Sequence, residues 1–119
     1  MKNKKTKTLS QLKTKADQVF SKKIRSRDKH RCFTCGKQME ENESQNGHYK
    51  SRVHLSTRYS EKNCHCQCVS CNIFKGGNLT VYAIRLEAKY GGGILQELEA
   101  EARKTVKNAR ALYESIINK

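Results

Sequence analysis

The sequence predicts a small α+β fold, in which a pair of short strands lies between an N-terminal helix and a long C-terminal helix. Three observations lead to this prediction. Apolar residues repeat with a helical period over residues 9–28 and again over residues 94–117. Short runs with valine, threonine, tyrosine and cysteine occupy residues 47–68, and such runs are typical of strands. A chain of 119 residues has the length of one domain.

The N-terminal part divides into a tail and a helix. Residues 1–8 are rich in lysine, threonine and asparagine, and we expect a disordered basic tail there. Over residues 9–28 the other face of the helix is basic and includes Lys22, Lys23 and Arg25. The helix is therefore amphipathic, and its apolar face consists of Leu9, Leu12, Ala16, Val19, Phe20 and Ile24.

Cap and turn signals predict the remaining elements. Residues 37–46 are polar and acidic, which indicates a loop. Asn78 is placed to cap a helix over residues 79–90, and the glycines at 91–93 end it. From residue 94 the helical period continues to residue 117, which predicts one long helix. Residues 94–119 would then pack on the domain formed by residues 9–93, or on a dimer partner.

Two Cys-x-x-Cys pairs are the strongest chemical signal. Cys32 and Cys35 form the first pair, and Cys68 and Cys71 form the second. Two thiolates at this spacing occupy adjacent corners of a tetrahedron, so the two pairs predict one structural Zn²⁺ site. Disulfides are disfavoured in a reducing cytosol, and no βαβ pattern supports a thioredoxin-like redox pair. Reduced cysteines without a metal are the other alternative.

Two more cysteines precede the second pair. Cys64 and Cys66 alternate with Cys68 along an expected strand, so they would face the core on the same side as Cys68. We interpret both as small packing residues. Exchange of a zinc ligand for Cys66 is the alternative.

The charge of the chain indicates the class of its partner. The formal net charge is +14 and the pI is about 9.7, which predicts a polyanion such as nucleic acid, or an anionic membrane surface. No apolar run approaches the ~20 residues that span a bilayer. The basic N-terminus is not followed by the apolar stretch of a secretory signal. We therefore expect a cytosolic protein that binds a polyanion and no membrane.

The segment between the cysteine pairs contains a candidate active site. It comprises residues 36–67, which is 32 residues, whereas an ordinary zinc ribbon has roughly 15–20 there. This insert carries His48 and Asn63, and Asn72 directly follows the last cysteine of the second pair. The pattern, together with "RSRDKHRCFTCGK", resembles that of the HNH nucleases, in which a ββα element holds one catalytic divalent metal.

The resemblance implies a role for each residue. His48 would be the general base that activates water, Asn63 would orient it, and Asn72 would bind a catalytic Mg²⁺ or Mn²⁺. An imidazole titrates near pH 7, and a cation would hold the scissile phosphate. His65 shares strand parity with Asn63 and is expected to assist the neutral Asn72. A surface or core histidine without a chemical role is the alternative for His48 and for His65. Many HNH enzymes have aspartate directly before the base, whereas this chain has Gly47, so its metal site is assembled differently, is weaker, or is absent.

A closer resemblance is to the phage recombination proteins of the NinG (Rap) family. The stretches that carry it, within residues 20–95, are "GHYKSR", "TRYSEKNCHCQCVSCNIFKGGNLTVY" and "RLEAKYG". The resemblance implies a structure-selective endonuclease for branched recombination intermediates such as D-loops and Holliday junctions. It also implies the cytoplasm of a bacterial host, during phage or prophage expression. The alternative is a zinc-containing accessory protein that binds DNA without cutting it.

Basic residues beside the insert are the candidate DNA contacts. Arg52 and Arg58 lie in or beside the expected hairpin, where they would clamp phosphates. Lys22, Lys23 and Arg25 would hold the backbone without sequence preference. Solvated surface charge is the alternative for Arg52 and for Arg58. A homodimer is a further expectation, because branched substrates often go with two-fold symmetry.

Overall fold

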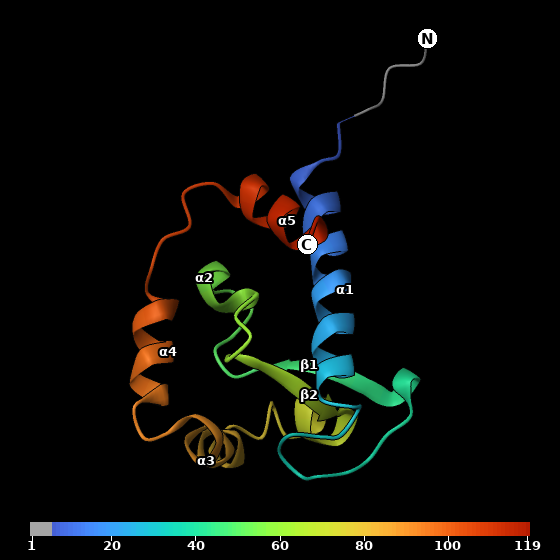
Figure 1. Ribbon diagram of the computed structural model, residues 1–119, viewed down its shortest axis with the longest axis vertical. Helices are drawn as coiled ribbons and strands as arrows, with labels where there is room; N and C mark the ends of the chain where they lie inside the picture. Colours follow the sequence, from blue (N-terminus) through green and yellow to red (C-terminus); the bar gives the residue numbers. More distant parts are fainter. Residues whose placement is uncertain (1–5) are drawn as a thin grey trace.

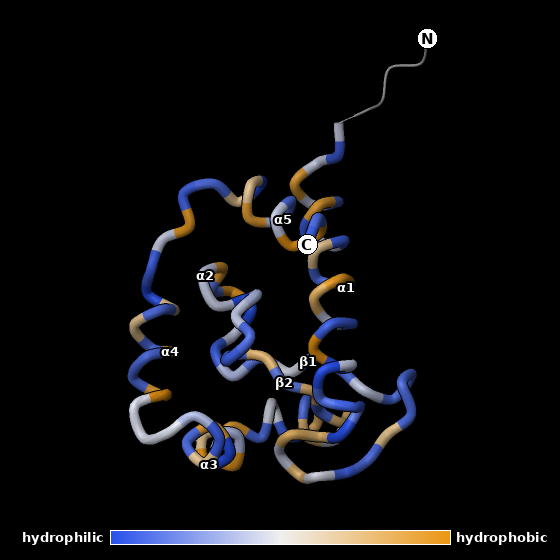
Figure 2. Tube along the Cα trace, in the orientation of Figure 1, coloured by the Kyte–Doolittle hydropathy of each residue, from blue (hydrophilic) through white to orange (hydrophobic). Residues whose placement is uncertain are grey.

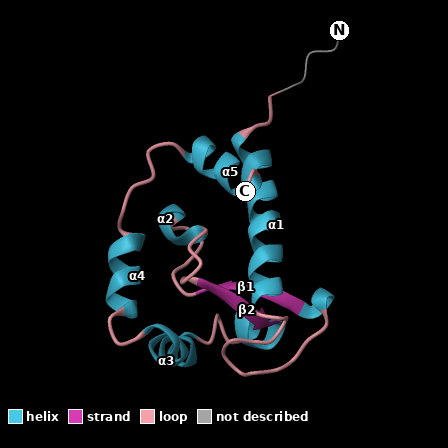
Figure 3. Ribbon diagram, viewed as in Figure 1, coloured by secondary structure: helices cyan, strands magenta, loops and turns pink. Residues whose placement is uncertain are grey.

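The computed structural model describes residues 6–119 and shows a two-stranded sheet surrounded by helices (Figures 1 and 3). The α+β prediction is confirmed. Residues 1–5 of the predicted tail lie outside the described residues. In chain order the elements are α1 (Leu9–Arg27), η1 (Glu41–Glu43), β1 (Ser44–His48), α2 (Leu55–Arg58), β2 (Cys64–Cys68), η2 (Ser70–Phe74), α3 (Leu79–Tyr90), α4 (Ile94–Ala102) and α5 (Ala109–Ile117).

Helix α1 starts where local chemistry favours a start. The Thr8 hydroxyl accepts a hydrogen bond from the Gln11 amide at 3.1 Å, and the Gln11 side chain accepts one from the Thr8 amide at 2.9 Å. This reciprocal capping box satisfies two backbone donors at the helix start. Most of the predicted apolar face is buried, with Leu12, Ala16, Phe20 and Ile24 in the core. Leu9 is 48% exposed and Val19 is half-buried.

The second strand lies inside the predicted region 47–68, but the first begins three residues before it. Strand β1 begins at Ser44 and pairs antiparallel with β2, so that Ser44 faces Cys68 and His48 faces Cys64. The predicted loop 37–46 therefore contains η1 and the first part of a strand. The prediction failed because "SQNGH" has no apolar alternation, and its strand conformation comes from backbone pairing with a buried partner. The link between the strands contains the short helix α2, which was also not predicted.

Helices cover both faces of the sheet. The side of β2 that carries Cys64 packs against α1 in the main apolar core. On the opposite side, His65 contacts Tyr82 of α3. All five residues of β2 are buried as a result. A polar residue on either face of this strand must therefore find a partner inside the protein.

The predicted long C-terminal helix is two helices. Helix α4 packs on α2 and α3, and α5 packs on α1. In Figure 1 the chain from α3 to α5 curves around the segment that carries α2 and returns to α1. The α4–α5 connection is mostly hydrophilic (Figure 2). Asn108 caps the second helix by accepting a hydrogen bond from the Ala111 amide at 3.0 Å. One straight helix cannot contact both surfaces, and these contacts bring residues 94–117 back onto the domain itself.

Candidate functional site

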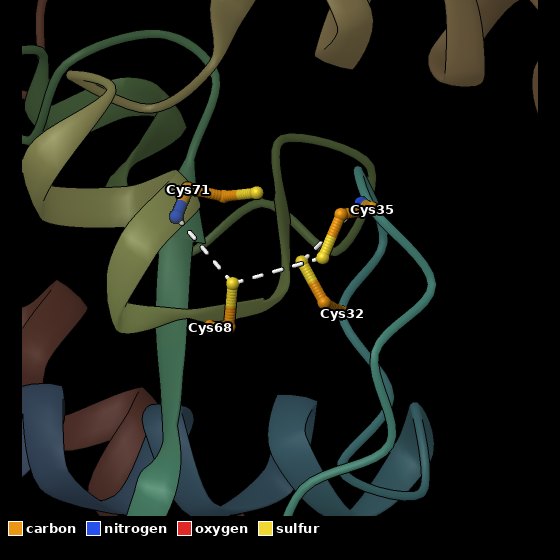
Figure 4. Close-up of side chains that lie close together, drawn as sticks. All are labelled: Cys32, Cys35, Cys68 and Cys71. Atoms are coloured by element: carbon orange, nitrogen blue, oxygen red, sulfur yellow. Dashed lines mark hydrogen bonds between the residues drawn. The ribbon is translucent and has the colours of Figure 1, made fainter.

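Four cysteines converge in the structure as the sequence predicted (Figure 4). Cys32 and Cys35 lie in the turn after α1, Cys68 ends β2, and Cys71 lies in η2. Their sulfur atoms all lie within 4.8 Å of one another, and those of Cys35 and Cys68 are 3.7 Å apart. A tetrahedral Zn²⁺ with Zn–S bonds of about 2.3 Å places its sulfurs about 3.8 Å apart. The cluster is therefore suited to a metal ion such as Zn²⁺.

The surroundings of the cluster favour a thiolate at Cys32 and a neutral thiol at Cys35. The backbone amides of Cys35 and Cys71 donate to the sulfurs of Cys32 and Cys68, at 3.5 and 3.4 Å. Burial alone would raise the pKa of Cys32, but hydrogen bonds from the Thr34 hydroxyl and nearby amides lower it to about 6. Partial burial and the neighbouring thiols raise the pKa of Cys35 to about 12. Four thiolates at this distance need a bound cation to offset their mutual repulsion.

The other two cysteines pack without joining the cluster. Cys64 belongs to the core between α1 and α5, and Cys66 packs with Met39 and with Cys32, Cys68 and Cys71. Burial raises the pKa of Cys66 to about 11, in keeping with a neutral thiol. The interpretation of both as packing residues is confirmed.

A groove of about 550 Å³ lies between α1, β1, α2 and η2, and it brings His48 and Asn72 together. Arg25 and Arg52 also line it, as does Asp17 of α1. The predicted base and the predicted metal ligand thus share one cavity. Because β1 and η2 are separate elements, no local pattern placed these two side chains in one cavity.

His48 has a defined tautomer. Its Nε2 lies 2.8 Å from the carbonyl oxygen of Arg58, and a carbonyl only accepts, so Nε2 carries the proton. Nδ1 therefore holds a lone pair, and among the described residues it has no hydrogen bond. Burial lowers the pKa of His48, and the charges of Arg52 and Arg58 lower it further. The imidazole is consequently neutral at pH 7 and able to accept a proton.

Arg58 does not lie free to bind phosphate, contrary to the expectation. Its side chain is 5% exposed and donates to both carboxylate oxygens of Asp17, at 2.9 and 2.6 Å. A third bond, of 2.8 Å, reaches the carbonyl of Arg52. Tyr59 also donates to Asp17, at 2.8 Å. These bonds fix the segment whose carbonyl holds His48, so Arg58 acts as a positioning residue.

Asp17 is the site residue that sequence reasoning missed. Burial would raise its pKa, but the hydrogen bonds from Arg58 and Tyr59 lower the pKa below its usual value, so the carboxylate stays charged. One signal was available, since Asp17 is the single acidic residue within α1, whose other charged residues are basic. An isolated carboxylate in a basic helix indicates an internal partner.

Asn63 closes a loop instead of contacting the base. It is fully buried, its oxygen accepts from the Lys50 amide at 2.7 Å, and its amide nitrogen donates to the carbonyls of Lys50 and Thr57. The loop tied in this way leads directly to Arg58, whose carbonyl accepts from His48. Any orientation of His48 by Asn63 therefore passes through the backbone.

His65 lies away from the groove, contrary to the expectation that it assists Asn72. It is fully buried, and its two ring nitrogens lie 3.0 and 2.9 Å from the hydroxyls of Tyr82 and Tyr90. Its ring stacks on Phe33 with centroids 4.0 Å apart. Burial, followed by the charge of Arg27, lowers the pKa of His65 to about 3. His65 does lie on the strand face opposite the cysteines, as predicted, but α3 covers this face.

Crowding at Gly47 explains why this chain has no aspartate directly before His48. A Cβ at Gly47 would lie 1.8 Å from the side-chain oxygen of Gln67, so no side chain fits there without displacing Gln67. Asn46, on the strand face shared with His48, lines the groove and has a buried amide oxygen without a hydrogen-bond partner among the described residues. Asn72 donates through its nitrogen to the side-chain oxygen of Gln45 at 2.8 Å, so the nitrogen of its amide is already engaged.

The predicted basic contacts separate into two groups. Arg52 is exposed at the groove, and Arg25 lines the groove while its guanidinium donates to Ser21 at 3.0 Å and to the Glu41 carbonyl at 3.1 Å. Lys22 and Lys23 are exposed on α1 outside that lining. Lys23 lies 3.8 Å from the Glu61 carboxylate, a surface pair that contributes little to stability.

The fold and the site define a small α+β protein with a four-cysteine cluster suited to a metal and a separate groove around a neutral histidine. A family model described as "Bacteriophage Lambda NinG protein" matches residues 1–119, and the chain belongs to that family.

Several curated relatives from phages are similar to the chain. Protein ninG of Escherichia phage 933W is 33% identical, and that of Escherichia phage lambda is 31% identical, each over 82% of this chain and 50% of the relative. Protein ninG of Salmonella phage P22 is 33% identical over 75% of the chain and 44% of the relative. The chain thus spans about half the length of these relatives. No solved structure matches, and none of the helices among residues 6–119 is long and apolar enough to cross a membrane.

Proposed function

We propose that this protein is a metal-dependent endonuclease of the HNH type that cuts branched DNA during phage recombination in the bacterial host cytoplasm. The proposal rests on the hydrogen bonding and position of His48. Its Nε2–H is held by a backbone carbonyl, its Nδ1 lone pair is unpaired among the described residues, and it shares a groove with Asn72. The order β1, β2, η2 also follows the ββα order that the HNH resemblance implies.

The chemistry assigned to the groove is hydrolysis of a phosphodiester. Nδ1 of His48 would take a proton from a water molecule, whose oxygen attacks phosphorus while the bond to one ester oxygen breaks. That ester oxygen leaves with the electron pair and gains a proton from solvent. General-base assistance of this kind contributes roughly 10²–10⁴-fold to a rate. The Arg58 carbonyl, held through Asp17, would keep the imidazole aligned.

The groove supplies oxygen donors that suit Mg²⁺ or Mn²⁺. The amide oxygens of Asn72 and Asn46 are the candidate ligands, and a bound cation would neutralise charge on the phosphate. Among residues 6–119, the only cluster of three or more His, Cys, Asp or Glu side chains placed to hold a metal is the four-cysteine one. Two neutral oxygens bind such a cation weakly, so DNA phosphate and water would supply the other ligands.

The positive charge of the chain supports binding to DNA. The net charge is +14, and Arg25 and Arg52 line the groove where a phosphate would be held. Lys22 and Lys23 would extend this contact along α1. The preference for Holliday junctions or D-loops comes from the family resemblance, and a homodimer would suit such two-fold substrates.

One comparison tests the proposal. The zinc-loaded protein, His48→Ala and a matched control, His54→Ala, are incubated with a branched oligonucleotide and Mg²⁺ or Mn²⁺. His54 is an exposed histidine six residues along the chain that does not line the groove. We expect the unsubstituted protein and His54→Ala to cut, and His48→Ala to bind without cutting. Binding without cleavage by all three would favour the accessory protein, a reading that the absence of a carboxylate at Gly47 supports.

A further inference from the structure

The two apolar side chains that follow Asn72 in the chain are exposed. Ile73 is 57% exposed and lines the groove beside Asn72. Phe74 follows at the last position of η2 and is 81% exposed, the highest value among the large apolar side chains described. Phe74 lines neither of the two cavities that border η2. Its ring therefore extends into solvent, one residue after the last residue that lines the groove.

The backbone that carries Phe74 is firmly held. The amide of Lys75 donates to the Ser70 carbonyl at 2.9 Å, and that of Gly77 donates to the Cys71 carbonyl at 2.9 Å. Cys71 itself is a member of the four-cysteine cluster. An aromatic ring on such a support has only its own side-chain rotation to lose when a flat partner stacks on it.

The surrounding charge indicates what kind of partner this ring meets. Lys75 follows Phe74, and Arg25 and Arg52 line the adjacent groove. A phosphate chain held by these cations would bring its bases to the rim. Bases inside a duplex are already stacked on each other, whereas a base at a branch point exposes a face to which an aromatic ring can stack.

We propose that Phe74 is a stacking platform for an unpaired nucleobase at a branch point of DNA seated in the groove. This inference rests on the proposed function, because it needs DNA in that groove, and it deepens it by naming the residue that distinguishes branched from duplex DNA. Stacking on an aromatic ring accepts any base, so the platform selects structure without selecting sequence.

The test measures binding in the His48→Ala background, so that no substrate is cut. Affinities for a forked oligonucleotide and for a duplex of the same composition are compared at fixed salt, with Phe74→Ala, Phe74→Trp and a control, Ile84→Ala. Ile84 is 61% exposed on α3 and does not line the groove. Phe74→Ala should weaken binding to the fork by roughly 5- to 150-fold, the value of one stacked base, and leave binding to the duplex unchanged. Phe74→Trp and Ile84→Ala should retain both affinities.

A positional readout accompanies the affinities. When 5-iodouracil occupies the unpaired position of the fork, it should photocrosslink to Phe74 in the protein that retains this residue. Mass spectrometry maps the crosslinked residue. Equal loss on fork and duplex, unchanged binding to the fork, or a dimer that dissociates in Phe74→Ala would each overturn the inference. All readouts are of binding, so failure of the unsubstituted protein to cut DNA would refute the nuclease proposal and leave this test unaffected.

Discussion

Replacement of Asp17 by Asn should weaken both the fold and the proposed site. The guanidinium of Arg58, with its side chain 5% exposed, would then face a neutral amide in place of a carboxylate that accepts from it at 2.9 and 2.6 Å. Removal of one partner of a fully buried pair costs about 3–5 kcal/mol. Because the Asp17 side chain is 30% exposed, solvent screens part of the lost attraction, and we expect about 2 kcal/mol.

Thermal unfolding of the zinc-loaded protein at pH 7 measures this loss. For a chain of this size, about 2 kcal/mol corresponds to a fall in Tm of roughly 6–10 °C. A double-mutant cycle with Arg58→Met isolates the coupling between the two side chains. Glu114→Gln is the matched control, because it also removes one negative charge, from an exposed position on α5.

The same substitution has a second expected effect. A loosened Arg58 no longer fixes the carbonyl that accepts from His48, so cleavage of branched DNA should fall while zinc content stays constant. An unchanged Tm in Asp17→Asn, or an equal fall in Glu114→Gln, would refute the reasoning from this ion pair.

Three further predictions concern the metals and pH. Cys71→Ser should lose zinc and unfold, because structural zinc contributes on the order of 10 kcal/mol to folding. Cys64→Ala should keep its zinc. Metal analysis that finds no zinc in the unaltered folded protein would contradict this prediction. Cleavage should rise with pH through a His48 pKa below 6.5 and be level at neutral pH. Arg52→Ala removes a charge that lowers this pKa, so the acid limb of the rate profile should move to higher pH, and a shift to lower pH would contradict the assignment. Asn46→Asp adds a carboxylate to the groove and should tighten Mn²⁺ binding, measured by electron paramagnetic resonance; unchanged binding would remove Asn46 from the site.

The sequence predicted those features whose signals are local. The apolar face of α1, the two cysteine pairs and the glycines after α3 each act within a few residues, and the structure confirms them. The cap predicted at Asn78 is not formed, because its side chain makes no hydrogen bond to the first turn of α3. The alternation of Cys64 and Cys66 with Cys68 likewise placed all three on one face of a strand.

What the sequence could not predict depends on contacts between distant segments. Arginine and histidine side chains are usually exposed to solvent. No pattern in the sequence indicates that Arg58 is paired with Asp17 inside the protein, or that His65 lies between two tyrosine hydroxyls. The apolar residues keep a helical period from α4 through α5, yet the chain bends at residues 103–108. The bend is needed because α4 packs on α2 and α3, whereas α5 packs on α1.

By itself, the sequence determined the four-cysteine cluster, the basic helix and the order of His48 and Asn72 along the chain. Only the tertiary structure decided which polar residues face the groove. Strand alternation assigns two faces to a sheet, but the packing of helices decides where a groove stays open to solvent beside them. Here α3 covers the face with His65, and the groove beside α1 exposes His48, Asn46 and Asn72.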